Sequence, residues 1–510
     1  MNHIHKRTVT YLVPTITLET FQDLYLINGL MDAVHNEDQP LTSLEFNCGD
    51  GNFGETYGGR YDPSAADLKT RMSVAQGNRL LNYYLFAGGR NYRTDWKLND
   101  GNDRIATTGE RHGFAAPVNP EGELNYTYPR LAQSIKTMMA VSDKLAVMNE
   151  EYDAVAFGFI PDYYMTEYHY PLSEKVKEMH HNLTANRAHG AWEIMARAML
   201  LAGYRFTAVD VQNKVLDPKE TKTIALPSAS YMAREVQTKL VNFLNEGGGL
   251  LLYGEVPIYD MEGKDCTILA RALGVSYAGH KQATQEYFLS VETDPNSFIG
   301  PNPQVRTHVA QLFNVTHAKA MLRVYGTNEI CGFESKVGKG TAVSITTAYR
   351  CDINLFEKVL ERLGTSVNLK HNFKHHGIFM TSVKNNEERF LHVLNLDGFD
   401  KAFQVEMFNK PLFEGRELEV QQKEGLMLPL NVQINEHVKI NYSTAEIMEV
   451  KKESIEFRLT QSKDVIAIET SLEIVSKSDY KLERVSTKRV LIHSKKHAKV
   501  DNQLIVHFRV

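Results

Sequence analysis

The sequence predicts a mixed α/β fold with parallel sheets, followed by antiparallel β-sandwich modules. Three observations predict it. Strand and helix patterns alternate through residues 1–148, and the alternation resumes with longer buried strands in 149–368. In 369–510, short runs of Val, Ile and Thr alternate with Lys and Glu between turns, as in antiparallel sandwiches. At 510 residues, the chain has the length of about three domains.

Residues 1–148 predict a parallel sheet with crossover helices. Apolar residues recur with helical spacing in 21–34 and 131–148, and a further helix is expected to begin near Pro63. The strands are expected at 9–16, 40–46 and 81–86, and the last two run into glycine-rich loops. Helices placed between such strands require parallel pairing, because tight turns join only antiparallel strands.

Residues 149–368 predict a second, open α/β sheet of the doubly wound flavodoxin type. A predicted helix that contains 192–201 ends at Gly203, and a second at 233–245 ends at Gly247–Gly249 and is followed directly by a strand. The turn Pro227–Ser230 contains neither a cysteine nor a Gly-x-Ser-x-Gly nucleophile elbow. We therefore expect an amidotransferase-like domain without catalytic function, acting as a scaffold or as a contact in a homo-oligomer. Its strands are expected at 155–160, 206–211, 224–226 and 250–253, with shorter ones near 321–324 and 342–346.

Composition and charge exclude several function classes. The chain carries 57 Lys and Arg against 62 Asp and Glu, which argues against nucleic acid as a partner. No apolar run approaches the ~20 residues that span a bilayer, and Pro14 interrupts the apolar stretch that could suggest a signal peptide. Four widely separated cysteines predict free thiols and a cytoplasmic protein. The histidine pairs and Asn99–Asp103 lack metal-ligand spacing, so neither a metal nor another cofactor is expected.

A carboxylate, Glu45, lies at the end of the strand expected at 40–46, directly before a glycine-rich loop. In a β/α barrel, the loops at the carboxyl ends of the strands build the active site, although a surface carboxylate is also common at a strand end. Aromatic rings and amides beside a carboxylate suit a sugar, whose ring has apolar faces and hydroxyl edges. The end of the next strand and the loop after it supply such groups: Tyr84, Phe86, Asn91, Tyr92 and Trp96.

Three segments resemble a known family. They are Pro40-Leu-Thr-Ser-Leu-Glu-Phe46, Asn82-Tyr-Tyr-Leu-Phe-Ala-Gly-Gly-Arg-Asn91, and Ala116-Pro117 with Glu121-Gly122 downstream. Together they resemble glycoside hydrolase family 35 β-galactosidases over residues 9–148. The second segment matches the family pattern Asn-x-Tyr-x-Phe-x-Gly-Gly-x-Asn at every fixed position. The third departs from the family's Tyr-Asp-Tyr-Asp-Ala-Pro, which indicates altered sugar contacts. The middle domain resembles the flavodoxin-like domain of related β-galactosidases, including family 42.

The resemblance implies retaining hydrolysis of terminal β-galactosides, with Glu45 as the nucleophile. It also implies a set of substrate-binding residues: Asn47, Tyr84, Asn91, His112 and Phe114. A retaining enzyme needs a second carboxyl group, the acid/base, about 5–5.5 Å from the nucleophile. In the family this group lies upstream, yet only 44 residues precede Glu45. We therefore expect residues 1–148 to be the C-terminal part of a (β/α)8 barrel, with the acid/base missing from this chain.

A catalytically inactive carbohydrate-binding or structural fragment is the alternative. Three β/α units cannot close a barrel, so they would expose sheet edge and apolar surface unless a partner covered them. The expected partners are a β-galactoside or oligosaccharide and a separate N-terminal barrel half. We expect little or no hydrolysis by the chain alone.

Overall fold

The computed structural model describes residues 16–36, 39–49, 62–90, 92–93, 111–164, 169, 171–187, 189–302, 304–350, 352–497 and 502–509. The chain forms two compact units. The first unit contains residues 29–36 and the described part of 152–367, and the second contains the described parts of 16–28, 39–151 and 368–509. The parts expected at 1–148 and 369–510 thus lie in the same unit. No helix within the described ranges is long and apolar enough to cross a membrane.

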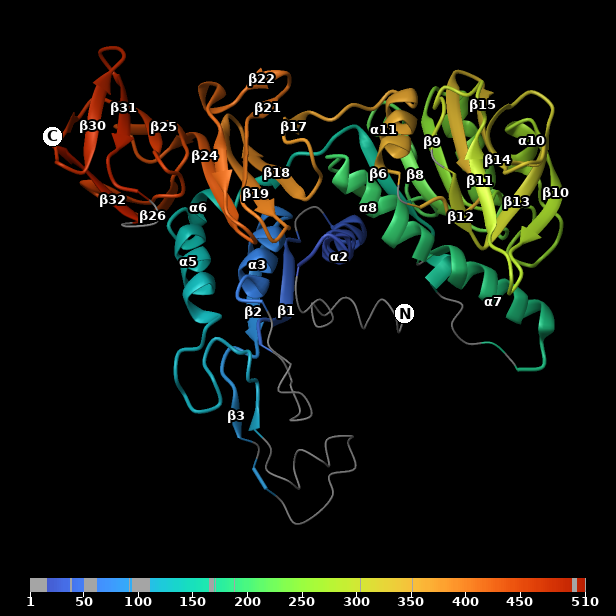
Figure 1. Ribbon diagram of the computed structural model, residues 1–510, viewed down its shortest axis with the longest axis horizontal. Coiled ribbons are helices and arrows are strands. Elements are labelled where there is room, and N and C mark those ends of the chain that lie inside the picture. The colour runs from blue at the N-terminus through green and yellow to red at the C-terminus, as the bar shows by residue number, and fades with distance from the viewer. Residues whose placement is uncertain are drawn as a thin grey trace. The chain divides into compact units, whose positions relative to one another are not determined.

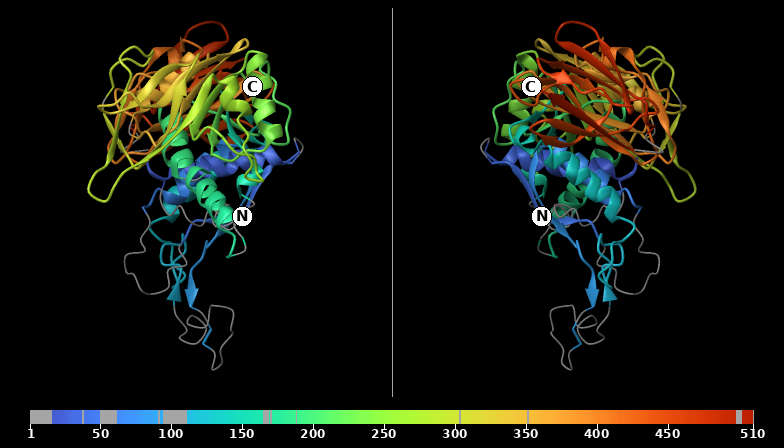
Figure 2. Two further views of the ribbon diagram at one scale, coloured as in Figure 1. Left: turned by 90° about the vertical axis from the view of Figure 1, so that its right-hand side faces the viewer. Right: turned by 90° about the vertical axis from the view of Figure 1, so that its left-hand side faces the viewer.

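An eleven-stranded mixed sheet forms the first unit, and the left view of Figure 2 faces it. Five of its strands are parallel, in the spatial order β7-β6-β8-β9-β16. Numbered along the chain, this is the order 2-1-3-4-5 of flavodoxin-type sheets. Strand β8 is buried at every position, as both faces of such a sheet are covered. The bounds are β6 (Val155–Phe159), β7 (Thr207–Asp210), β8 (Thr223–Ser228), β9 (Gly249–Gly254) and β16 (Gly340–Ile345).

Helices pack on this sheet around one apolar core. The expected end of the helix at Gly247–Gly249 is confirmed: Gly247 has a φ of +111°, and a Cβ on Gly248 would collide with the ring of Phe243. Only glycine fits both positions without strain. The bounds are η2 (Pro161–Tyr164), α7 (Glu174–Arg187), the π-helical η3 (His189–Ala196), α8 (Arg197–Leu201), α9 (Arg234–Asn245), α10 (Ile268–Ala272) and α11 (Ile353–Arg362).

The antiparallel extension of this sheet was not predicted in full. Strand β15 pairs antiparallel with β16, and further antiparallel strands continue outward from it. Of these strands, the sequence indicated only the one near 321–324. The bounds are β10 (Val275–Gln282), β11 (Leu289–Thr293), β12 (Val305–Thr307), β13 (Val309–Val315), β14 (Lys319–Val324) and β15 (Ile330–Val337).

In the second unit, two parallel strands lie beside helices (Figure 1). They are β1 (Leu41–Asn47) and β2 (Asn78–Tyr84), joined through α3 (Ala65–Ala75). The single helix expected at 131–148 is instead two helices, because Val141 has non-helical backbone angles. Those helices are α5 (Tyr128–Met139) and α6 (Ser142–Leu145). The remaining elements are α2 (Phe21–Val34), which continues into the first unit, and the short strands β3 (Gly89–Arg90) and β4 (Arg111–His112).

The C-terminal part contains one long antiparallel sheet rather than two separate sandwiches. Its eight strands lie in the order β30-β31-β28-β25-β24-β19-β18-β5. Neighbouring residues serve opposite faces: Phe390 belongs to one core and Leu391 to the other. The bounds are β5 (Asn149–Glu150), β18 (Ile378–Asn385), β19 (Glu388–Asn395), β24 (Gly425–Gln433), β25 (Val438–Ser443), β28 (Val465–Thr470), β30 (Tyr480–Arg484) and β31 (Arg489–Ser494).

Smaller sheets cover the two faces of the long sheet. Helices α5 and α6 and the sheet β26-β27-β32-β29 contribute to one core, and the sheets β17-β21-β22 and β20-β23 contribute to the other. The bounds are β17 (Leu369–His371), β20 (Lys401–Phe403), β21 (Val405–Met407), β22 (Lys410–Pro411), η4 (Phe413–Gly415), β23 (Leu418–Val420), β26 (Glu446–Lys451), β27 (Ser454–Arg458), β29 (Glu473–Ile474) and β32 (Gln503–Arg509).

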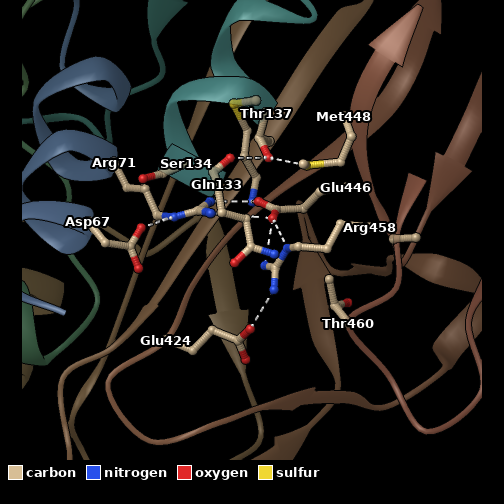
Figure 3. Close-up of polar contacts among 12 residues, drawn as sticks. Asp67, Arg71, Gln133, Ser134, Thr137, Glu424, Glu446, Met448, Arg458 and Thr460 are labelled. Carbon is tan, nitrogen blue, oxygen red and sulfur yellow. Dashed lines mark hydrogen bonds and ion pairs between the residues drawn. The ribbon is translucent and has the colours of Figure 1, made fainter. Parts of the chain in front are cut away.

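A buried ion network links α3 to the C-terminal strands (Figure 3). The carboxylate of Glu446 lies between two guanidinium groups, 2.6 Å from Arg71 and 2.6 Å from Arg458. Arg71 also pairs with Asp67 at 2.7 Å, and Arg458 with Glu424 at 2.9 Å. Although burial alone would raise the pKa of Glu446, the two guanidinium groups lower it to about 2. The network therefore ties α3, the helix between the two parallel strands, to β26 and β27 of the four-stranded sheet.

Candidate active site at the ends of two parallel strands

A register shift in β1 displays Glu45. Ser43 is opposite Leu81, and Phe46 is opposite Tyr83, so two residues of β1, Leu44 and Glu45, face the single residue Asn82. The side-chain amide of Asn82 donates a hydrogen bond of 2.8 Å to the Leu44 carbonyl oxygen. Such bulges are found beside active sites, because they re-aim a side chain. The position of Glu45 at a strand end was predicted, but no sequence pattern indicated the bulge.

The two faces of the strand pair have different roles. Phe46 and Tyr83 contact each other edge to face at 5.3 Å, and the Tyr83 hydroxyl bonds to Thr70 of α3 at 3.0 Å. This face therefore packs on the helices. Asn47 pairs with Tyr84 in the register, and alternation places both on the opposite face. Two of the predicted substrate-binding residues thus lie side by side.

Three backbone segments converge just beyond the strand ends. A Cβ on Gly49 would lie 2.6 Å from both the Leu85 carbonyl oxygen and the Ala116 Cα atom, so a glycine is required there. Cys48 donates its backbone N–H to the Tyr84 carbonyl oxygen at 2.8 Å and its thiol to the Leu85 carbonyl oxygen at 3.2 Å. Burial raises the pKa of this thiol to about 12, so it remains protonated.

The Ala116-Pro117 segment lies beside the end of β2. Val118 donates its backbone N–H to the Phe86 carbonyl oxygen at 3.0 Å, and its own carbonyl oxygen accepts the Gly88 N–H at 2.8 Å. The amide of Asn125 donates to the carbonyl oxygens of Phe114 and Ala116, at 2.7 and 2.9 Å. Asn125 was missed from the sequence, because a loop asparagine has no distinguishing pattern. Its two bonds fix the backbone on both sides of Ala115.

A buried lysine supports the end of β1 and was also missed. Lys69 of α3 is fully buried and donates to the carbonyl oxygen of Asn47. Its ammonium group lies 5.8 Å from the centre of the Phe46 ring, within the range of a cation–π contact. The signal in the sequence was weak, since a lysine within a helix is normally solvated.

The predicted site residues differ in how far the structure describes them. Glu45, Tyr84 and Phe114 are half-buried, and Asn47 is buried. The backbone of His112 lies in β4, paired with Gly89 of β3, but its side chain is outside the described set. Asn91 and Trp96 also lie outside the described residues. Tyr92 is 85% exposed.

Three kinds of comparison relate the chain to carbohydrate-active enzymes. A family model described as the GLMA-like second domain matches residues 174–319. In sequence, the chain is similar to a β-1,2-glucosyltransferase of Ignavibacterium album, 23% identical over 409 residues covering 74% of this chain and 50% of the relative. It is also similar to an exo-β-D-glucosaminidase of Pyrococcus horikoshii, 24% identical over 408 residues covering 77% and 48%.

Among solved structures, the fold is similar to that of β-galactosidases. The Rahnella sp. R3 enzyme matches with a TM-score of 0.60 and 13% identity, covering 81% of this chain and 58% of that one. A family 42 β-galactosidase of G. stearothermophilus matches with a TM-score of 0.58 and 14% identity, covering 80% and 56%. The likeness concerns the multidomain fold. The chain spans about half the length of the curated relatives it matches. The similarity of fold to a family 42 β-galactosidase thus covers most of the chain.

Proposed function

We propose that this chain is the C-terminal part of a retaining β-glycosidase in which Glu45 is the nucleophile. The observation that carries the proposal is the bulge opposite Asn82. It displays a carboxylate at the carboxyl end of a parallel strand, on the same strand as Asn47 and beside the strand that carries Tyr84. In β/α barrels, this end of the strands is where catalytic groups lie.

In the proposed reaction, a Glu45 oxygen attacks the anomeric carbon and the bond from that carbon to the glycosidic oxygen breaks. The acid/base carboxyl donates its proton to the departing oxygen, which leaves as an alcohol. The glycosyl–Glu45 ester is then cleaved by water, whose proton returns to the acid/base group, and the sugar leaves with its β configuration retained. The acid/base group is proposed to lie on the N-terminal part of the barrel.

The other residues would bind the sugar. Tyr84 is proposed to hydrogen-bond to the nucleophile or to a hydroxyl, and Asn47, Asn91 and His112 to contact hydroxyl groups. Phe114 would cover an apolar face of the ring. The guanidinium carbon of Arg111 lies 5.6 Å from the centre of the Phe114 ring, which restricts where that ring can move.

Two substrates are favoured by different observations. Terminal β-galactosides are favoured by the second motif, Asn82 to Asn91, and by the likeness of the fold to β-galactosidases. Terminal β-glucosaminides are favoured by the relative named an exo-β-D-glucosaminidase, which is more similar to this chain in sequence than those β-galactosidases are. The altered third segment, 112–115, is where the two specificities would diverge.

An N-terminal barrel half is the proposed partner of the strand pair. Within the described residues, β1 and β2 pair only with each other. By alternation along β2, Leu80 lies on the face opposite Tyr83, and it is 48% exposed. Leu44, in the bulge, is 72% exposed. Apolar side chains on a two-stranded sheet need a covering layer. Further β/α units would supply both the missing neighbours of the strands and the acid/base group.

The test uses the intact gene product, combined with the N-terminal half if that half is encoded separately. Glu45→Ala should abolish turnover of aryl β-galactosides or aryl β-glucosaminides, and azide should restore it by forming an α-glycosyl azide in the vacated space. A matched control is Glu456→Gln, which changes a half-buried carboxylate on β27 of the same unit and should leave turnover unchanged. A β-configured azide product, or full activity of Glu45→Ala, would reject the assignment. No activity in the wild type on either substrate would favour the inactive alternative.

A further inference from the structure

A cavity of about 870 Å³ lies at the carboxyl edge of the parallel sheet in the first unit. Its wall includes the residues that follow β8 and β9, Ser230 and Glu255, and the face of α7 that carries Asn182 and Asn186. Open α/β sheets bind ligands outside the carboxyl ends of their strands, in sites of roughly 300–1,000 Å³. All lining residues belong to this unit, whereas Glu45 belongs to the other one.

A buried carboxylate is fixed in the wall of this cavity. Glu255 accepts hydrogen bonds from Asn182 at 2.8 Å and from the Ser230 hydroxyl, and its other oxygen lies 3.2 Å from Nε2 of His280. Gly254 makes this placement possible, since it has a φ of +119° and a Cβ there would collide with the Ser228 carbonyl oxygen. Burial opposes ionisation, but the three donors lower the pKa of Glu255 below its ordinary value.

The hydrogen bonds continue from Glu255 to a tyrosine at the cavity surface. Nδ1 of His280 lies 2.7 Å from the hydroxyl oxygen of Tyr277. With Nε2 protonated toward Glu255, Nδ1 accepts the hydroxyl proton of Tyr277. The phenol oxygen then keeps its lone pairs for donors from a ligand. Tyr277 is 41% exposed, so a ligand can reach it.

A stacked aromatic pair lines the same cavity. The rings of Tyr231 and Tyr259 lie 5.2 Å apart at an interplanar angle of 29°. The backbone holds the pair, because Met232 donates its N–H to the Tyr259 carbonyl oxygen at 3.0 Å. In the same wall, the side-chain amide of Gln311 accepts a hydrogen bond from the Val256 N–H at 2.8 Å and donates one to the Val256 carbonyl oxygen at 3.1 Å. The aromatic surface and the polar relay are therefore both preorganised.

We propose that this cavity binds a neutral hexopyranose unit of an oligosaccharide without cleaving it. Stacked phenol rings suit the apolar face of a sugar ring, and Asn186, Tyr277 and the relay behind it suit its hydroxyl edge. The wall sets two carboxylates, Glu178 and Glu255, against the one guanidinium of Arg350, so it offers an anion no excess of fixed positive charge. A cation is disfavoured because the Glu255 oxygens already accept three side-chain donors. The site would add a second point of attachment for a glycan.

Hydrogen–deuterium exchange of the intact chain, with D-galactose and lactose as probes, tests the proposal. Sugar should slow exchange in peptides covering 178–186 and 277–282. Tyr259→Ala should raise the half-saturating concentration about tenfold, the scale of one aromatic contact. Tyr277→Phe keeps the packing and should raise it severalfold. Tyr325→Ala removes a tyrosine that is 56% exposed and outside the cavity wall, and should change nothing.

The result is independent of the proposed hydrolase activity. Glu45→Gln should leave protection of 178–186 and 277–282 unchanged, whether or not Glu45 is catalytic. The proposal is overturned if neither sugar protects these peptides. It is also overturned if Tyr259→Ala and Tyr277→Phe bind both sugars as tightly as the wild type, or if tetramethylammonium gives the protection and the sugars do not.

Discussion

Replacing Glu446 by glutamine is expected to destabilise the second unit by about 3–5 kcal/mol, the cost of breaking a buried ion pair. The substitution keeps the shape of the side chain and one acceptor oxygen but removes the negative charge. Arg71 and Arg458 would then share a neutral amide while their guanidinium groups stay buried. The pKa shift of Glu446 gives a free energy of similar size. Lowering the pKa of Glu446 from 4.5 to about 2 corresponds to about 3 kcal/mol at neutral pH.

Hydrogen exchange measures this loss within the unit that contains the network. Amides in α3 and β26 that exchange only through global opening should exchange about a hundredfold to several thousandfold faster in Glu446→Gln, since each 1.4 kcal/mol is about tenfold. Glu449→Gln is the matched control on the same strand. Its pair with Lys451 is exposed and 2.8 Å long, so solvent screens it and its removal should leave amide exchange nearly unchanged. Equal exchange in Glu446→Gln and the wild type would refute the reasoning.

Further predictions concern acid sensitivity, the bulge and the glycine contact. Because the folded-state pKa of Glu446 is lowered, its contribution to folding stability is complete above about pH 4.5 and is lost as the pH falls toward 2. Acid titration of the wild type should therefore show extra destabilisation in that window, and Glu446→Gln should lack it. Asn82→Asp removes the hydrogen-bond donor to the Leu44 carbonyl oxygen. It should lower kcat about tenfold with little change in KM, because about 1–2 kcal/mol of positioning of Glu45 is lost. Equal losses in kcat and substrate affinity would argue against a positioning role for Asn82. Gly49→Ala should lower stability by about 1–3 kcal/mol through contact with Leu85 and Ala116, whereas Gly89→Ala, with open space around its Cβ position, should be nearly neutral in thermal unfolding.

Local patterns predicted individual elements well where apolar spacing was strong. Strand β1 was expected at 40–46 and lies at Leu41–Asn47, and the helix expected at 233–245 lies at Arg234–Asn245. The break between α5 and α6 was not predicted, because the apolar spacing continues through it without a glycine or proline. Both halves still pack on the same core through Met138 and Leu145.

Tertiary pairing was harder to predict. In β24, Leu426 and Leu428 enter one core while Met427 enters the other, so a strand apolar on both faces indicates a sheet covered on two sides. The sequence does not say which segments provide that cover. The same applies to the site. Glu45 and Tyr84 could be selected by type and position, whereas the bulge at Asn82, the clamp by Asn125 and the support by Lys69 arise from contacts distant in sequence.

Trapping the covalent intermediate tests the central claim most directly. A 2-deoxy-2-fluoro β-glycosyl fluoride has a leaving group that needs little acid catalysis, and its glycosyl-enzyme is cleaved slowly by water. Incubated with the intact gene product, the galacto- or gluco-configured reagent should label one carboxylate, and peptide mass spectrometry should place the label on Glu45. A label on any other residue, with Glu45 unmodified in an enzyme that turns over, would contradict the account.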